Sequence, residues 1–229
     1  MSRRVVEDLG CRTHDMVLVH RVFRREFRLL ADIVEATSPT DAEQVTRVSA
    51  HAREMLAALH RQHRNEDELV WPKLLSAELD STVLDLMQTQ HEQIDAIMRR
   101  LDAELSEWEH QGGAETTDLL AEGLRRLHEA LTEHLRLEED TALPIVAATL
   151  TASEWAELGK RGMASFSKGR ALVFLGHIAE EADEREWSEF LREVPVPVRL
   201  LYRVFGRRGH ARETALLRRD LRSVGKVVR

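Results

Sequence analysis

The sequence predicts an all-α protein, an up-down-up-down four-helix bundle with a helical C-terminal extension. Apolar residues recur at steps of three and four over four long segments, which is the periodicity of amphipathic helices. No stretch of any length shows the two-residue alternation of a half-buried strand. Long amphipathic helices with short connections bury their apolar faces best by packing side by side as a bundle.

The first predicted helix covers about residues 13–36, where Val19, Phe23 and Phe27 follow one another at helical spacing. "TSPTD" ends it and begins the second helix, which covers about residues 41–70. Pro72 must end or bend this second helix, because proline lacks the amide donor and clashes with the preceding turn.

The third predicted helix begins near residue 81, carries an apolar stripe that includes Leu84 and Met87, and stops at the Gly112–Gly113 pair. The fourth covers about residues 115–140, and we expect it to end before Pro144 for the same reason as at Pro72.

Beyond about residue 150 the helices become shorter and are interrupted by glycines and by the "PVP" at 195–197. "TASE" at 151–154 has the pattern of a capping box, which marks a helix start. We therefore divide the chain into a bundle at residues 12–147 and a helical extension with a basic C-terminal tail at residues 148–229.

Composition limits the compartment and the partners. Cys11 is the single cysteine, so an intramolecular disulfide is excluded and a reducing cytoplasm is expected. No apolar run approaches the ~20 residues that span a bilayer, and the N-terminus has no signal-like apolar segment, so no membrane partner is expected.

Charge is distributed unevenly along the chain. Residues 199–229 carry +8 and the remaining residues −15, which together give the net −7. One interpretation is that the basic tail docks on the acidic body; the other is that it contacts nucleic acid or another anionic surface. A nucleic-acid partner is not favoured, because the tail lacks interleaved aromatic residues and a recognisable DNA-reading motif.

Each predicted helix places a histidine on or beside its apolar stripe; these are His20, His63, His91 and His134. Ionisable groups inside a bundle are costly unless they are paired or bind a metal. Glu138 follows His134 by four residues and Glu66 follows His63 by three, so each pair shares a helix face. A site built from imidazoles and carboxylates favours iron, zinc, manganese or copper, and two facing half-sites could hold two ions with bridging carboxylates.

Other histidines fit this pattern less well. His20 is preferred to His14, because it lies in register with the apolar stripe. His51 and His60 are expected at the surface or the flank of their helix, and His177 and His210 fall outside the pattern. Whether Asp67 joins the site stays open.

Four segments resemble the hemerythrin-like family of HHE cation-binding domains: "VHRVFRREF", "HRNEDELVWPKL", "QHEQID" and "HLRLEEDTALP". The resemblance covers roughly residues 12–147. It implies a four-helix bundle around two non-heme iron ions (Fe2+/Fe3+) with carboxylate and oxo bridges. The implied terminal ligands are His20, His91, His134 and the second-helix histidine, and Glu66 and Glu138 are the implied bridges.

The chain departs from the family pattern at two places. Gln62 stands where alignment on the prolines puts the second-helix histidine, and His63 follows one residue later, rotated by about 100°. We therefore expect His63 to be imperfectly placed. In the third helix, Met87 and Asp95 stand four residues from His91, where oxygen carriers have a second histidine.

The incomplete histidine set argues against plain oxygen storage. It favours binding of, or reaction with, a small oxidant such as oxygen, peroxide or nitric oxide, in redox defence or sensing. An enzyme that consumes peroxide or nitric oxide is one form of this hypothesis. The alternative is a metal-responsive regulatory or interaction module whose basic C-terminal tail contacts a partner.

Overall fold

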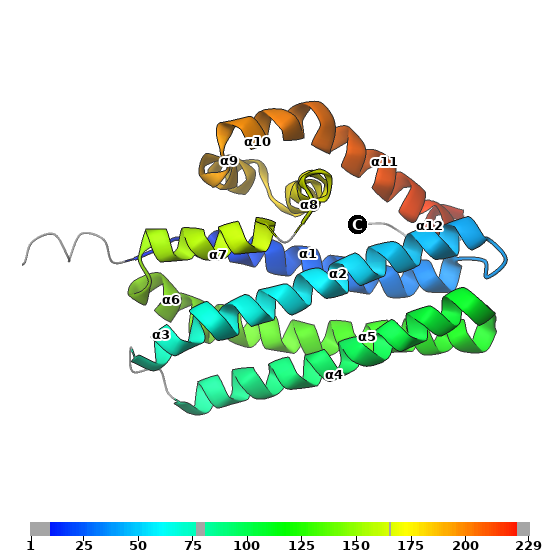
Figure 1. The fold of residues 1–229 in the computed structure, drawn as a ribbon, viewed down its shortest axis with the longest axis horizontal. Coiled ribbons are helices and arrows are strands. Elements are labelled where there is room, and N and C mark those ends of the chain that lie inside the picture. The colour runs from blue at the N-terminus through cyan, green and yellow to red at the C-terminus, as the bar shows by residue number, and fades with distance from the viewer. Residues whose placement is uncertain (1–9, 77–80, 165, 224–229) are drawn as a thin grey trace, which may run out of the picture.

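The computed structural model describes residues 10–76, 81–164 and 166–223. Within these ranges the chain is built from helices and contains no β-strand, which confirms the predicted all-α bundle (Figure 1). None of the described helices combines the length and the apolarity that crossing a bilayer requires.

Four long helices pack side by side: α1 (His14–Ala36), α2 (Ala42–Leu69), α4 (Ser81–Gln111) and α5 (Ala114–Leu137). α1 lies against α2 and α5, and α4 lies against the same two helices, so the four enclose a common interior (Figure 1). Their bounds agree with the predicted ranges to within a few residues.

The bundle interior is a continuous apolar cluster to which each long helix contributes. Phe27, Leu59, Leu101 and Leu131, one from each helix, are almost completely buried. Burial of one such side chain stabilises the fold by about 1.5–3 kcal/mol. Isolated helices are marginally stable in water, so this shared interior supports their helical structure.

The two prolines act differently from the simple helix stop that the sequence suggests. α2 ends at Leu69, and Pro72 is the second residue of the short helix α3 (Trp71–Ser76). α5 ends at Leu137, before Pro144 as predicted, but the chain stays helical through a π-helical segment (Glu138–Ala142) into α6 (Leu143–Thr149). The π-helical turn lets Leu143 donate to the carbonyl of Glu138, and proline is tolerated in the first turn of α6.

The C-terminal extension packs along α1 and α2 (Figure 1). Its elements are α7 (Ala152–Ala164), α8 (Lys168–Glu181), α9 (Glu184–Glu193), α10 (Val196–Leu201), a π-helical segment (Tyr202–Gly206), α11 (Arg207–Leu217) and α12 (Arg219–Ser223). The predicted capping box forms, since the Glu154 amide donates to Thr151 Oγ1 over 3.2 Å and the Thr151 amide to Glu154 Oε2 over 2.9 Å. Phe174 and Ile178 of α8 join the apolar cluster of the bundle. The division of the chain at residue 147 stays a prediction.

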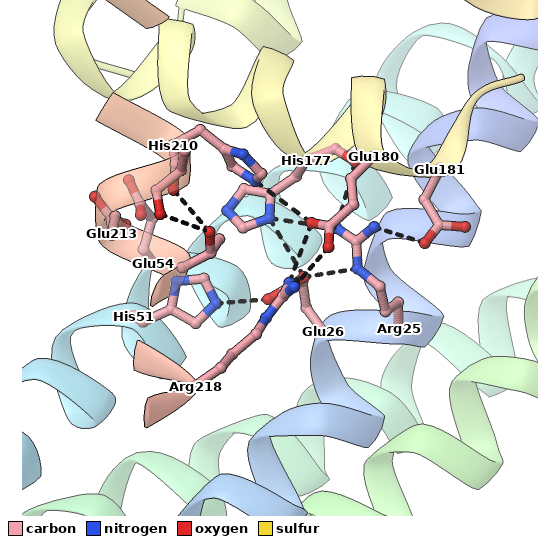
Figure 2. Close-up of polar contacts among 12 residues, drawn as sticks. Arg25, Glu26, His51, Glu54, His177, Glu180, Glu181, His210, Glu213 and Arg218 are labelled. Carbon is pink, nitrogen blue, oxygen red and sulfur yellow. Dashed lines mark hydrogen bonds and ion pairs between the residues drawn. The ribbon is translucent and has the colours of Figure 1, made fainter. Parts of the chain in front are cut away.

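A buried group of polar side chains, here called the docking network, holds the extension on the bundle (Figure 2). Its centre is Glu26 of α1, which is 1% exposed. Glu26 Oε1 accepts hydrogen bonds from Arg25 Nε over 2.9 Å and from Arg218 Nη2 over 3.0 Å. Glu26 Oε2 lies 2.9 Å from His51 Nε2 of α2, and Oε1 lies 3.3 Å from His177 Nδ1 of α8.

The network keeps Glu26 ionised. Burial alone would raise the pKa of Glu26, but the hydrogen bonds and positive potential contributed by His177 and His51 outweigh it and hold the pKa well below its usual range. Arg218 also binds Glu180 over 2.6 Å, and Arg219 binds Asp41. These two arginines of the basic tail therefore dock on the acidic body.

We expect Glu26→Gln to lower the free energy of unfolding by about 3 kcal/mol at neutral pH, because it removes the buried charge that accepts hydrogen bonds from Arg25 and Arg218. Since folding lowers the pKa of Glu26, its contribution is complete above the ordinary value of 4.5 and is lost as pH falls through the folded pKa. The gap between wild type and variant should therefore narrow below pH 4.5. Urea unfolding over a pH series measures it.

Glu43→Gln is the matched control, because it removes an exposed ion pair with Arg47 on α2. Its cost should stay below about 1 kcal/mol at every pH. A Glu26→Gln cost as small as that of the control, or one that does not change with pH, would contradict a structural role for the network.

Candidate metal centre

The structure brings together all six residues that the sequence marks as candidate ligands. Each lies inside the bundle with an exposed fraction of 4% or less. They come from all four long helices and the π-helical segment, namely His20 (α1), His63 and Glu66 (α2), His91 (α4), His134 (α5) and Glu138.

The six residues form two adjoining groups. The histidine group consists of His63, His91 and His134, and the carboxylate group of His20, Glu66 and Glu138; in each, one ligand atom per residue lies within 4.8 Å of the others. The groups meet where His91 Nε2 lies 3.7 Å from Glu66 Oε2 and His134 Nε2 lies 3.9 Å from Glu138 Oε2. The two carboxylates of the carboxylate group therefore border the histidine group, and each could contact an ion in either group.

Hydrogen bonds on the outer side of three imidazoles fix which nitrogen faces the centre. The outer Nδ1 atoms pair as follows: His20 with Glu139 at 2.9 Å, His91 with Asp67 at 2.9 Å, and His134 with Gln90 Oε1 at 3.0 Å. Because these partners are acceptors, each Nδ1 carries the proton and each Nε2 offers a lone pair to the centre. Metal-binding histidines are commonly held in this way.

Two of these lone pairs face each other at short range. His91 Nε2 and His134 Nε2 are 3.0 Å apart, and both Nδ1 protons are already directed to acceptors. Two lone pairs at this distance repel unless a cation lies against both. Nitrogens that bind one ion at ~2.1 Å and about 90° from one another are ~3.0 Å apart, which is the observed spacing.

Within the described part of the chain, no lysine or arginine pairs with the two carboxylates of the centre. Burial raises the pKa of Glu66 well above its usual range, and the nearby Glu138 raises it further; burial also raises the pKa of Glu138. Among the described residues, neither forms an ion pair with a lysine or arginine, and the Oε2 atom of each lacks a hydrogen-bond partner. Buried carboxylates in this condition fit a bound cation.

Two of the imidazoles, those of His134 and His63, are held neutral, which suits them to the same role. Burial, together with His91 and His20, lowers the pKa of His134 to about 2, and burial lowers that of His63 well below its usual range. Neutral imidazoles and carboxylates make the centre a set of electron-pair donors. Such a set suits a transition metal with mixed nitrogen and oxygen ligands.

A contrast with the docking network shows why this centre is the better metal candidate. Glu26, His51 and His177 also place their ligand atoms within 4.8 Å of one another. Glu26, however, already accepts hydrogen bonds from Arg25 and Arg218. The other two His/Glu groups, one within the extension and one between the extension and α2, likewise have guanidinium partners, Arg218 on Glu180 and Arg170 on both Glu54 and Glu213. Arginine therefore supplies the positive charge there.

Gln62 and His63, the two residues at which the second helix departs from the family pattern, both line the centre. His63 lies in the histidine group with its ring stacked on His91, centroids 4.0 Å apart, but neither of its ring nitrogens has a hydrogen-bond partner, so its imperfect placement as a ligand stays a prediction. Gln62 also reaches the centre, with Nε2 at 2.9 Å from Glu66 Oε1 and from His20 Nε2. Successive residues can both contribute because the two groups lie side by side, His63 in one and Gln62 beside the other. Asp67 supports His91 from outside.

His14 lies apart from the centre, where it pairs with Glu186 over 2.8 Å at the surface. The expectation that His51 lies at the surface or flank is wrong, since it is 4% exposed and contacts Glu26. A signal was available in the sequence, because His51 stands three residues after Val48 and four before Met55, on the apolar stripe of its helix.

Comparison with known families supports the assignment of this region. The sequence model of the family described as "Hemerythrin HHE cation binding domain" matches residues 11–146. That range contains all six residues of the centre and ends before α7. Comparisons with curated proteins and with solved structures give no match.

The uncompensated carboxylates predict an unusual response to mutation. In metal-free protein at neutral pH, Glu66→Gln should raise the free energy of unfolding, by about 1.4 kcal/mol for each unit by which folding raises the pKa of Glu66. Glu68→Gln on the same helix removes a half-exposed charge and should change stability by less than about 1 kcal/mol. Urea unfolding in the presence of a chelator tests this; a Glu66→Gln variant less stable than wild type would show that the carboxylate is already compensated.

Proposed function

Because this chain belongs to the hemerythrin HHE cation-binding family, we propose that it binds two non-heme iron ions and reacts with a small oxidant, in redox defence or sensing. The observation that carries the proposal is the pair of buried carboxylates, Glu66 and Glu138, shared between two three-residue groups and lacking a counter-charge. Two divalent ions would supply that charge.

The donor set supports iron. Imidazole and carboxylate ligands together suit a redox-active first-row metal, whereas calcium and magnesium prefer oxygen ligands throughout. The histidine group would hold one ion and the carboxylate group the other, with Glu66 and Glu138 able to contact both. When bound, iron supplies the electrons that reduce a small oxidant.

The side chains around the centre position its donors and limit access by water. Glu139, Asp67 and Gln90 hold three imidazoles by their outer nitrogens, so the rings cannot turn away from the centre. Trp71 is almost fully buried, with its ring centroid 6.1 Å from that of His91. The carboxylate group is also close to Gln62, whose Nε2 donates to Glu66 Oε1 over 2.9 Å and lies 2.9 Å from His20 Nε2.

Reaction is favoured over storage by the number of donors. With both carboxylates shared, the histidine group would offer an ion five protein donors and the carboxylate group three, so at least one position of a six-coordinate ion would remain for water or for a small exogenous molecule. α4 adds a single imidazole to the centre, because Met87, one turn before His91, is buried and apolar and Asp95, one turn after it, pairs with His60. Oxygen, peroxide and nitric oxide are small enough to use such positions.

The interaction-module alternative draws on a separate feature. Several arginines of the extension, including Arg203 and Arg207, are exposed on its outer side. They are far along the chain from the centre and could contact a partner whether or not iron reacts. The two roles are compatible, and each needs its own test.

Iron content and absorption spectra test the proposal directly. Wild-type protein purified under iron-replete conditions should contain two irons per chain, show near-ultraviolet absorption from bridged iron, and change spectrum on addition of peroxide. His134→Ala should lose most of this iron, because His134 is a donor of the histidine group. His128→Ala, on the same helix but outside the centre, should keep it.

Unchanged iron in His134→Ala would place the metal elsewhere. If the protein contains two irons but its spectrum does not change with peroxide, oxygen or nitric oxide, it binds the cations but does not have the proposed redox role. One iron per wild-type chain would contradict the dinuclear proposal.

The unequal groups predict unequal affinities. Gln62→His places an imidazole beside His20 and Glu66, so we expect it to raise the affinity of the weaker-bound ion at least about tenfold. Titration of metal-free protein with Fe2+ under anaerobic conditions should show two binding steps that move closer together in the variant. Gln93→His, exposed on α4, is the control and should leave both steps unchanged. If Gln62→His leaves the separation between the two binding steps unchanged, residue 62 does not contribute a metal ligand.

A further inference from the structure

The outer side of α10 and the following π-helical segment exposes a concentration of large apolar side chains. Five of them lie within ten residues and are 48–64% exposed: Val196, Leu200, Leu201, Val204 and Phe205. Their spacing of four and five residues places them along adjacent ridges of one helical surface. Monomeric proteins seldom expose such a group without a binding role.

The stretch of chain that carries these apolar side chains is positively charged. Residues 196–212 contain five arginines and no acidic residue, whereas the remaining residues of the chain carry −12. Among the described residues, the exposed arginines of this stretch form no hydrogen bond or ion pair; they are Arg203, Arg207, Arg208 and Arg212. Arg218 and Arg219, a few residues later, are instead paired to the bundle. The apolar residues and the unpaired arginines together are here called the outer patch.

The outer patch is held in place from behind. Tyr202 and Leu217 on the inner side are buried in the apolar cluster of the bundle. At Gly206 a Cβ atom would approach Leu172 O to 3.1 Å and a Tyr202 ring carbon to 2.5 Å, so the helix lies very close to α8 there. α10 and α11 run along the outer edge of the molecule, with their far side open (Figure 1).

We propose that the outer patch docks this protein on an anionic lipid surface. Apolar side chains interspersed with arginines along one helix are the composition of helices that lie in the bilayer interface, where the apolar groups enter the headgroup boundary and arginines bind phosphate. Such docking needs no spanning segment. It therefore revises the expectation of no membrane partner, which considered only spanning segments and signal peptides.

Charge and shape favour lipid over other anionic partners. α10 and α11, which carry the outer patch, lie at the edge of the molecule, which suits contact with a broad planar surface (Figure 1). Nucleic acid would use arginine and stacking aromatic residues, whereas four of the five exposed apolar side chains are aliphatic. Because the rest of the chain is strongly acidic, an anionic surface repels it and turns the outer patch toward the lipid.

Sedimentation with vesicles tests the proposal. Full-length protein should bind vesicles of phosphatidylcholine mixed with phosphatidylglycerol, bind pure phosphatidylcholine weakly, and lose binding as salt rises. The double variant Arg203→Gln, Arg207→Gln should bind roughly 25-fold more weakly, since each arginine near the surface contributes roughly fivefold. Phe205→Ser should weaken binding roughly tenfold.

Matched variants on the far side of the bundle separate position from overall charge and hydropathy. Arg99→Gln with Arg126→Gln removes the same charge from exposed positions of α4 and α5, and Leu119→Ser removes an exposed apolar side chain of α5. These should bind the mixed vesicles like wild type. Metal-free protein should also bind, so failure of the iron proposal leaves this one standing.

Absence of binding to the mixed vesicles overturns the proposal, as does equal loss in the patch and control variants. Loss on removal of arginines with no effect of Phe205→Ser would also overturn it, because only surface charge would then be recognised. If the vesicles do not bind but the outer-patch variants abolish a concentration-dependent dimer or binding of poly-glutamate, the surface serves a protein contact instead.

Discussion

The structure depends on how buried negative charge is compensated inside a helical bundle. An ionised carboxylate cannot remain in an apolar interior without a partner, because desolvation costs several kcal/mol per ion. The chain meets this constraint in two different ways. Glu26 receives guanidinium groups from its own chain, whereas Glu66 and Glu138 face neutral imidazoles and each other. That difference separates an ion-pair network that docks helices from a centre suited to a metal.

Two helices connect these regions. On α1, His20 and Glu26 are six residues apart, which rotates them by about 240° and directs them to different sides. On α2, His51 joins the docking network, and His63 and Glu66 lie about three turns further on, in the centre. The extension therefore clamps the two helices that supply three of the six candidate donors. Its stabilising contacts and the geometry of the centre share the same scaffold.

The sequence predicts the parts of this arrangement that follow helical periodicity. His20, His91 and His134 are predictable because each interrupts an apolar stripe, and Glu66 and Glu138 because each shares a face with a histidine. His51 and Glu26 obey the same rule, but their partners, His177 and Arg218, come from distant segments whose contacts no local pattern reveals. The outcome at Pro144 depends on a π-helical turn, which changes the hydrogen-bond register without a marked sequence signal. The sequence alone could not predict that Gln62 and His63 both line the centre. Adjacent residues of a helix point in different directions, and both reach the centre only because it is wide enough to hold two adjoining groups.

The unequal groups have a consequence for the proposed chemistry. An ion in the histidine group would have three imidazole donors of its own and only a share of the two carboxylates, which would favour its lower oxidation state. An ion in the carboxylate group would have the two carboxylates and a single imidazole, which would favour its higher one. Because Glu66 and Glu138 lie between the groups, a small shift of either carboxylate would change how charge is divided between the two positions. In metal-free protein, both carboxylates are buried without a cation to compensate their charge. Metal binding would therefore stabilise the fold, so binding and folding are linked. The chain loses folding stability at the same place where we propose that it reacts.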